Sequence, residues 1–376
     1  MTSTLVLHAY DARNRGDGLL VSESIRLLSR AGLDATEFRV VAVNAASFGG
    51  ELSAVQYPLF GTRGLRRIRD SFTVALLAIG GVTTGRISRP VQLARLAREA
   101  DVIVGVGGGY LQAGDRHAAT QAGLVHVPQL AIAASSRAPT IYLPQSIGPL
   151  SGPVGGAIRR HLAKITLVAS RDDETVAELA GPNVLRFPDL AVLRIGRELG
   201  TDPPRSGGTR VIGIARELGL PGYDKHLITL QQRLPIEWAV HSRAVGQDDA
   251  AFYRRIGVEE SGGSADLLDD HGFGVLVSVR LHGALQGILA GVPAIHLSYE
   301  RKGSGAYSDL GLDEWMHDAR TFDPDLVAHQ AEELRQDPTR YWHALDRAIP
   351  RLRASEEKLI AQVRRAAQGH APDAHD

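Results

Sequence analysis

The sequence predicts an α/β fold with two Rossmann-like domains that face a central cleft. Short apolar runs alternate with amphipathic segments along most of its 376 residues, and this alternation is typical of mainly parallel sheets. A stretch rich in Gly, Pro and Ser at 201–208 interrupts the pattern, which restarts after it. We therefore expect an N-terminal domain over 1–200, a linker over 201–208, a second domain over 209–323, and a helical segment with a tail over 324–376.

The individual elements follow from the spacing of apolar residues. β-Branched apolar runs predict strands, and apolar residues three and four positions apart predict helices. The expected strands are 4–8, 38–43, 102–106, 140–143, 166–169, 210–214, 236–241, 273–279 and 294–297. The expected helices are 18–29, 90–100, 284–290 and much of the chain after 324.

The bulk composition narrows the classes of function. Lys plus Arg and Asp plus Glu both number 42, so no global charge favours a nucleic-acid partner. The sequence contains no Cys, which excludes disulfides, thiolate catalysis and Cys-ligated metals. The N-terminus lacks the pattern of a signal peptide, and no apolar run reaches the ~18–20 residues of a membrane span. We expect a soluble, cytoplasmic protein.

The most informative stretch is 275–302, which predicts a strand, a turn, a helix and a second strand. Arg280 and His282 fall between the first strand and the helix, at the edge of a parallel sheet where ligands bind and free N–H groups attract anions. The helix start opposes a positive charge on His282, whereas a bound anion favours it. His282 would then act as an acid once an anionic substrate is bound. The alternative is a histidine that only packs or caps the helix.

A second group of polar residues follows the first expected strand. Asn14, Gly16 and Asp17 lie at the same carboxyl-end level of the sheet as the residues above. Asp17 is either a general base in the cleft or the N-cap of a helix that begins near Gly18, a position at which Asp is favoured for capping alone.

The glycines at 107, 108 and 109 follow the expected strand at 102–106. Their spacing satisfies neither the dinucleotide-binding motif nor the P-loop motif. Gly107, Gly108 and Gly109 therefore allow either the close approach of a ligand or another backbone, or a tight strand-to-helix turn.

Two further strands end in polar residues. Gln145 and Ser146 follow the strand at 140–143, and Arg171 follows the strand at 166–169. Arg171 either pairs with its neighbours Asp172 and Asp173 at the surface or supplies a guanidinium for a carboxylate or phosphate. We expect the polar segments that include these residues to be loops of the cleft.

Residues 63–82 place four arginines ahead of an apolar run that is too short to cross a bilayer. This pattern predicts either a buried helix with a solvated basic start or peripheral docking onto an anionic membrane surface.

Taken together, an ordered set of motifs between about residues 5 and 305 resembles the polysaccharide pyruvyl transferase family. The motifs are Asn14-Arg-Gly-Asp, Asp101-Val-Ile-Val-Gly-Val-Gly-Gly-Gly, Pro144-Gln-Ser-Ile-Gly-Pro, Ser170-Arg-Asp, Phe187-Pro-Asp-Leu-Ala, Arg280-Leu-His, Gly291-Val-Pro and Lys302. The resemblance implies a GT-B-like fold and a transferase of polysaccharide biosynthesis in the cell envelope. Such an enzyme moves the pyruvyl group of phosphoenolpyruvate to hydroxyls of a sugar in a polysaccharide, glycolipid or other glycoside. It forms a pyruvate ketal and releases phosphate.

The resemblance also implies roles for individual residues. Phosphoenolpyruvate would be bound by Arg171, Arg280, Leu281 and Lys302, with His282 as the acid and Asp17 as the base. The donor side would be the second domain and the acceptor side the first. No metal and no cofactor is expected. If residues 63–82 touch a membrane, a lipid-linked acceptor becomes the natural substrate.

Two rival functions remain open on the same fold. One is a nucleotide-sugar glycosyltransferase, and the other is an anion-binding protein without turnover. Residues 220–270 carry no motif that we assign, so the sequence does not predict the acceptor sugar.

Overall fold

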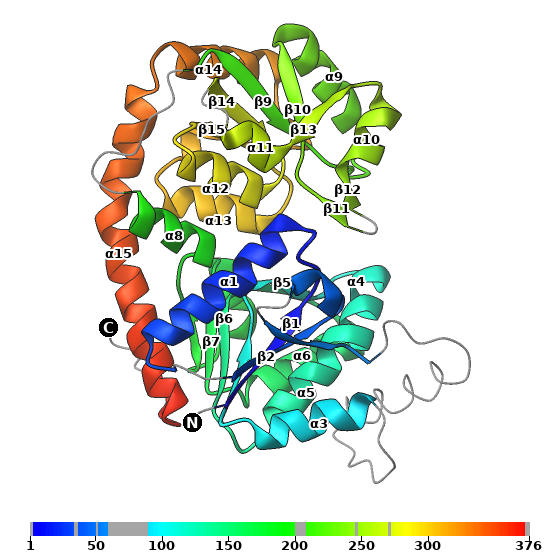
Figure 1. The fold of residues 1–376 in the computed structure, drawn as a ribbon, viewed down its shortest axis with the longest axis vertical. Helices are drawn as coiled ribbons and strands as arrows, with labels where there is room; N and C mark the ends of the chain where they lie inside the picture. Colours follow the sequence, from blue (N-terminus) through cyan, green and yellow to red (C-terminus); the bar gives the residue numbers. More distant parts are fainter. Residues whose placement is uncertain are drawn as a thin grey trace. The chain divides into compact units, whose positions relative to one another are not determined.

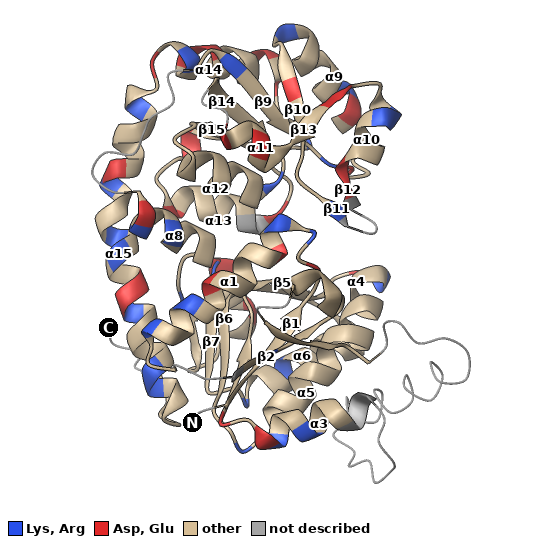
Figure 2. Ribbon diagram, in the orientation of Figure 1, with Lys and Arg blue, Asp and Glu red and all other residues tan. Residues whose placement is uncertain are grey.

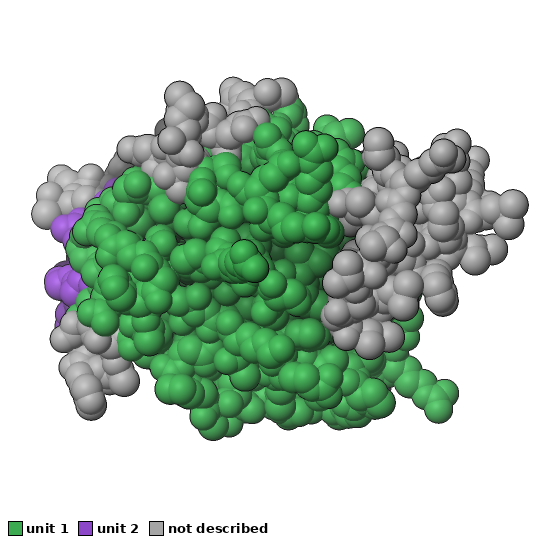
Figure 3. Space-filling view, turned by 90° about the horizontal axis from the view of Figure 1, so that it is seen from below, with its two compact units in different colours: residues 1–12, 17–190, 356–376 green, residues 13–16, 191–355 purple. Residues whose placement is uncertain are grey.

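The computed structural model describes residues 3–33, 37–49, 52–58, 89–199, 208–244, 247–269 and 272–372. The chain divides into two compact units, which are coloured separately in Figure 3. Unit 1 comprises Met1–Ala12, Asp17–Leu190 and Glu356–Asp376. Unit 2 comprises Arg13–Gly16 and Ala191–Ser355. Each unit contains one parallel sheet with helices around it (Figure 1).

The sheet of unit 1 has eight strands in the order β3-β2-β1-β4-β6-β7-β8, with β5 paired to β6. The strands are β1 (Ser3–Ala9), β2 (Glu37–Ala42), β3 (Ser53–Gln56), β4 (Val102–Gly105), β5 (Gly108–Ala113), β6 (Thr140–Leu150), β7 (Leu167–Ser170) and β8 (Val184–Arg186). β1 pairs in parallel with β2 on one side and with β4 on the other. The chain therefore reverses its direction of travel across the sheet between β1 and β4, and such a switch point is where open α/β sheets bind ligands.

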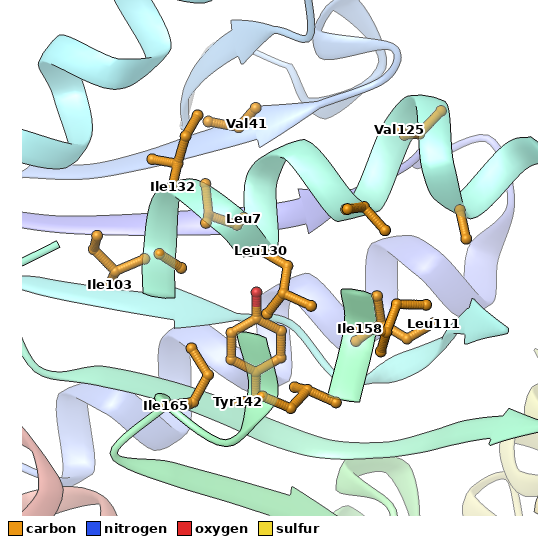
Figure 4. Packing of buried hydrophobic residues seen from close by; sticks show 14 of the residues in the cluster. Leu7, Val41, Ile103, Leu111, Val125, Leu130, Ile132, Tyr142, Ile158 and Ile165 are labelled. Carbon is orange, nitrogen blue, oxygen red and sulfur yellow. The ribbon is translucent and has the colours of Figure 1, made fainter. Parts of the chain in front are cut away.

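Helices complete unit 1. They are α1 (Arg15–Arg30), α3 (Arg89–Glu99), α4 (Arg116–Gln121), a π-helical turn over Ala122–His126, α5 (Val127–Ser135), α6 (Gly152–Leu162) and α7 (Asp173–Leu179), with a 3₁₀ turn over Ala45–Phe48. Apolar side chains from β1, α5, α6 and β6 form one core (Figure 4). Tyr142 lies in this core, and its hydroxyl is 2.7 Å from Nε2 of the buried His8.

The sheet of unit 2 has six strands in the order β13-β10-β9-β14-β15-β16. The strands are β9 (Arg210–Ile214), β10 (Ile236–Val240), β13 (Glu260–Gly263), β14 (Phe273–Ser278), β15 (Ala294–Ser298) and β16 (Met316–Asp318), with β11 (Arg243–Ala244) and β12 (Gln247–Asp248) as a separate antiparallel pair. β9 pairs in parallel with β10 on one side and β14 on the other. A second switch point therefore lies between β9 and β14.

The helices of unit 2 lead into a long C-terminal helix. They are α8 (Leu190–Glu198), α9 (Tyr223–Arg233), α10 (Asp249–Ile256), α11 (Ser264–Asp269), α12 (Leu281–Leu289), α13 (Arg301–Asp309), a 3₁₀ turn over Asp313–Trp315, α14 (Pro324–Gln336) and α15 (Thr339–Ala367). Basic and acidic residues both occur along α15 (Figure 2). Glu356, in the second half of α15, pairs with Arg30 at 2.9 Å within unit 1.

The expected strands and helices are confirmed where the structure describes them, with small shifts at their ends, except that the strand expected at 140–143 continues to Leu150. The bounds of the compact units differ from the expected domain bounds. Unit 2 resumes at Ala191 rather than near 209, and the chain returns to unit 1 at Glu356 because the second half of α15 packs there. Residues 201–207 of the expected linker and the whole segment 63–82 lie outside the described residues. Among the helices that the structure describes, none has the length and apolarity to cross a membrane.

Candidate active site

The loop after β1 positions three of the predicted residues. α1 begins at Arg15, earlier than expected, and the Oδ1 atom of Asn14 accepts a hydrogen bond of 3.2 Å from the Gly16 N–H. Asn14 thus makes the bond of an N-cap. The alternative that Asp17 caps the helix is therefore wrong, because Asp17 already lies in the first helical turn. Burial raises the pKa of Tyr10, and the negative charges of Asp17 and Asp11 raise it further.

The glycines after β4 allow other parts of the chain to approach closely, and they do not form a strand-to-helix turn. The chain passes from β4 directly into β5, so the turn alternative is wrong. A Cβ atom on Gly107 would lie 2.8 Å from the Pro144 carbonyl oxygen, which shows that another backbone passes there. A Cβ atom on Gly109 would lie 3.3 Å from Nη2 of Arg171. Gly109 therefore keeps that guanidinium edge uncovered by a side chain.

Arg171 is buried and held by two partners that are distant in sequence. Its Nε donates to Ser146 Oγ at 3.0 Å, and its Nη1 donates to the Asp189 carboxylate. The expected alternative of pairing with Asp172 and Asp173 is wrong. Asp172 caps α7 by accepting the Thr175 N–H, and Asp173 pairs with Arg186 at 3.4 Å.

Gln145 and Ser146 lie inside β6 rather than in a loop, because β6 continues to Leu150. Both residues are buried, and the Gln145 carbonyl accepts the Arg171 N–H at 3.1 Å. The strand thus fixes both the backbone and the side chain of Arg171. A buried guanidinium held on one edge by a carboxylate can bind an anion through its other edge.

Arg280 occupies the N-cap position of α12 in unit 2, directly beyond β14. It is 7% exposed and forms a two-oxygen ion pair with Asp249, with Nε 3.1 Å and 3.0 Å from the two carboxylate oxygens. Asp249 also accepts the backbone N–H groups of His241 and Ser242, at 3.1 Å and 2.9 Å. Burial raises the pKa of Asp249, while Arg280 and these two N–H groups oppose that rise. The carboxylate fixes the plane of the guanidinium.

His282 lies in the first turn of α12, two residues after Arg280. The backbone of Gly16 lies against its ring, since a Cβ atom on Gly16 would be 2.5 Å from His282 Nδ1. Asn14 and Ser242 form an isolated antiparallel bridge in the same unit, which holds this short loop in place. The structure thus brings Gly16 against His282 and Asn14 against Ser242, and Asp17 follows Gly16 in the chain.

The sequence reasoning missed His241 and Asp249. His241 directly follows β10, so it occupies the same carboxyl-end position that singled out Arg280. Its pKa is lowered well below the usual value by burial first and then by the positive charges of Arg280, His282 and Arg15. The rule of strand ends could therefore have found His241. Asp249 carried no such signal, because an Asp at a helix start is ordinarily read as a cap.

The two remaining predicted binding residues lie at helix starts. Leu281 is buried and is the first residue of α12. Backbone N–H groups in the first turn of a helix have no acceptor within the helix. Lys302 lies in the first turn of α13, but its side chain is not among the described ones. Among the described residues, no group of three or more His, Cys, Asp or Glu side chains is arranged to hold a metal ion.

Two parallel α/β units, each with polar residues at a switch point, are typical of the GT-B fold. Solved structures support this class. The S. aureus protein MnaA, solved with UDP, matches with a TM-score of 0.56 and 11% identity over 99% of each chain. The UDP-GlcNAc 2-epimerase of Neisseria meningitidis, bound to UDP-GlcNAc, matches with a TM-score of 0.53 and 10% identity over 96% of this chain and 99% of that chain. At such identities the likeness shows the fold alone, and the expected GT-B-like fold is confirmed.

The family is shown by sequence. Residues 14–301 match the polysaccharide pyruvyl transferase family, and the chain belongs to that family. The match begins at Asn14 and contains Asp17, Arg171, Arg280 and His282, whereas Lys302 lies one residue beyond it. A comparison with curated protein sequences found no significant match. Membership of this family makes the chain a pyruvyl transferase.

Proposed function

We propose that this protein transfers the pyruvyl group of phosphoenolpyruvate to two hydroxyls of a sugar, forming a ketal and releasing phosphate. The observation that carries the proposal is the start of α12, where a fixed guanidinium and an imidazole lie two residues apart at a switch point. An anion bound by Arg280 would lie beside the proton donor that its reaction needs. The family match gives this arrangement its chemical meaning.

Phosphoenolpyruvate carries a carboxylate and a phosphate, and it requires fixed positive groups for both. In this proposal Arg280, the Leu281 N–H and Lys302 bind one anionic group in unit 2. Arg171 binds through the guanidinium edge beside Gly109 in unit 1. Arginine suits this task because its planar donors match carboxylate and phosphate oxygens two at a time.

The chemical step begins with protonation. Imidazolium His282 gives its proton to the methylene carbon of phosphoenolpyruvate, and positive charge develops at C2. The oxygen of one acceptor hydroxyl forms a bond to C2 as Asp17 takes its proton. The bond between C2 and the phosphate oxygen then breaks, and a second hydroxyl of the acceptor closes the ketal. One hydroxyl proton replaces the proton that His282 gave, and the other leaves with the phosphate.

Asp17 suits the role of base because it places a carboxylate in the first turn of α1, three residues after Asn14. Asn14 makes the capping bond at the start of α1. The N-terminal turn of α1 favours the ionised carboxylate, and a carboxylate within hydrogen-bond reach of a hydroxyl can accept its proton. Gly16, which precedes Asp17, contacts the His282 ring through its backbone.

A thermal-shift comparison with product analysis tests the proposal. Phosphoenolpyruvate should raise the melting temperature, and UDP-GlcNAc should not. Incubation with phosphoenolpyruvate and a pool of glycosides and lipid-linked sugars should give a product whose mass corresponds to a pyruvate ketal. Stabilisation by UDP-GlcNAc alone, with glycosyl transfer, would support the nucleotide-sugar alternative. Stabilisation by phosphoenolpyruvate without any product across the panel would support an anion-binding protein.

A further inference from the structure

His241 is a buried histidine that the proposed chemistry does not use. It directly follows β10 and is 3% exposed. Its Nδ1 atom lies 3.1 Å from Ser264 Oγ, and its backbone N–H donates to Asp249. Ser264 is itself fully buried at the start of α11. His241 is therefore held by one ring nitrogen and by its backbone N–H.

The other ring nitrogen of His241 is different. Nε2 is buried and has no hydrogen-bond partner among the residues that the structure describes. Leaving a buried polar nitrogen unsatisfied costs ~1–3 kcal/mol, so such an atom calls for an explanation. A ligand that is present only during the reaction provides one.

The surroundings of His241 indicate the charge of that ligand. Arg280, His282 and Arg15 all lie close enough for their positive charges to lower the pKa of His241, in addition to the larger effect of burial. A neutral ring with one N–H suits such a place, because it adds a hydrogen-bond donor without a further positive charge. The Asp249 carboxylate ties His241 to Arg280, since it accepts from the backbone of the first and the guanidinium of the second.

We propose that His241 is a further substrate-contact residue, whose Nε2–H donates a hydrogen bond to an oxygen of the same anionic group that Arg280 binds. This inference rests on the proposed function, because it assigns His241 to the donor phosphoenolpyruvate. It requires that Ser264 Oγ–H donates to Nδ1, which leaves the proton on Nε2. The anionic group is either the phosphate or the carboxylate of the donor, and the two are distinguishable by probe.

Binding measurements on His241 variants test the inference. Inorganic phosphate, pyruvate and phosphoenolpyruvate serve as separate probes in calorimetry. His241→Phe removes the donor and should raise the Kd of phosphoenolpyruvate about tenfold or more, together with that of either phosphate or pyruvate. His241→Gln places an amide N–H near the position of Nε2 and should restore most of the affinity. His226→Phe is the matched control in the same unit, since His226 packs edge-on against Phe322, and it should leave every Kd unchanged.

A spectroscopic measurement on the wild-type protein covers the case in which His241→Phe does not fold. Nitrogen-15 NMR of the imidazoles should show the Nε2–H form of His241 and a shift of that nitrogen when the anion is added. Unchanged Kd values in both His241 variants, an unshifted nitrogen, or no binding of any probe by the wild type would overturn the inference. Loss of anion binding in His241→Phe, with no ketal formed by the wild type, would contradict the proposed function but leave the anion contact in place. Full ketal formation by both variants would instead support the proposed function and contradict the anion contact of His241.

Discussion

The backbone of Gly16 lies against the imidazole of His282, so closely that a Cβ atom on Gly16 would be 2.5 Å from Nδ1. The glycine next to the proposed base therefore contacts the proposed acid. No side chain larger than hydrogen fits unless the His282 ring moves, because real Cβ atoms essentially never approach a nitrogen that closely.

Gly16→Ala should therefore lower kcat through displacement of His282. A small misplacement of a catalytic group costs about 10²-fold in rate, whereas the KM for phosphoenolpyruvate should change little. Steady-state kinetics check this, with Gly156→Ala as the control, since a Cβ atom there would meet nothing within 4 Å. A kcat equal to that of the control would show that the contact does not position His282.

Asp249→Ala should destabilise the protein and weaken donor binding together. The carboxylate is fully buried and holds Arg280, and removal of one partner of a buried ion pair costs about 3–5 kcal/mol. Urea unfolding measures the stability, and KM for phosphoenolpyruvate measures the binding.

The double variant Asp249→Ala/Arg280→Ala gives the matched test of this pair. Its loss of unfolding free energy should be smaller than the sum of the two single losses, because no buried charge is left alone. Additive losses would mean that the two side chains do not depend on each other.

Gly109→Ala should weaken phosphoenolpyruvate binding with little loss of stability. The added methyl would lie 3.3 Å from Arg171 Nη2, the guanidinium edge that Asp189 and Ser146 do not cover. We expect KM to rise about tenfold, on the scale of one lost charge-assisted hydrogen bond. Gly123→Ala is the control, because its added methyl would make only an ordinary contact at 3.6 Å. Gly152 is unsuitable, since its positive φ strains any substitution. An unchanged KM would remove Arg171 from the donor site.

The pH dependence of stability should reveal the buried histidine pair of unit 1. His8 and His126 face each other with their Nδ1 atoms 3.3 Å apart, and burial lowers the pKa of His126 to about 3. The unfolded chain therefore takes up a proton near pH 6.5 that the folded protein does not bind. Stability should fall as the pH drops below that value, by about 1.4 kcal/mol per pH unit for each such group.

Urea unfolding between about pH 7 and pH 5 measures that slope. His126→Gln should have a shallower dependence than the wild type. His329→Gln should not, because the His329 side chain is 69% exposed and its partner Glu333 is exposed as well. Equal slopes in all three proteins would contradict the assignment of a neutral buried pair.

Position in a parallel sheet explains which parts of the site the sequence could predict. Arg280, His282, Arg171 and Asp17 were found because each follows an apolar strand, and strand ends share one edge of a sheet. Their partners were not predictable in the same way. Arg280 pairs with Asp249 across 31 residues and Arg171 with Asp189 across 18, and no local pattern encodes those distances.

The fold shows the same division. Apolar spacing predicted the strands and helices of both units, since burial of an apolar face determines them locally. It did not predict that β6 would continue through Gln145 and Ser146 or that the second half of α15 would belong to unit 1. Both features depend on packing between segments that are far apart in the sequence.

The most direct measurement is acceptor-dependent release of phosphate from phosphoenolpyruvate by the wild type and His282→Ala, with His329→Ala as an exposed control. The pooled glycosides and lipid-linked sugars serve as acceptors. General acid catalysis contributes typically about 10²–10⁴-fold, so His282→Ala should lose at least about 10²-fold in kcat while it still binds phosphoenolpyruvate. His329→Ala should match the wild type. Release by His282→Ala within about threefold of the wild-type rate, far less than such catalysis supplies, would contradict the account.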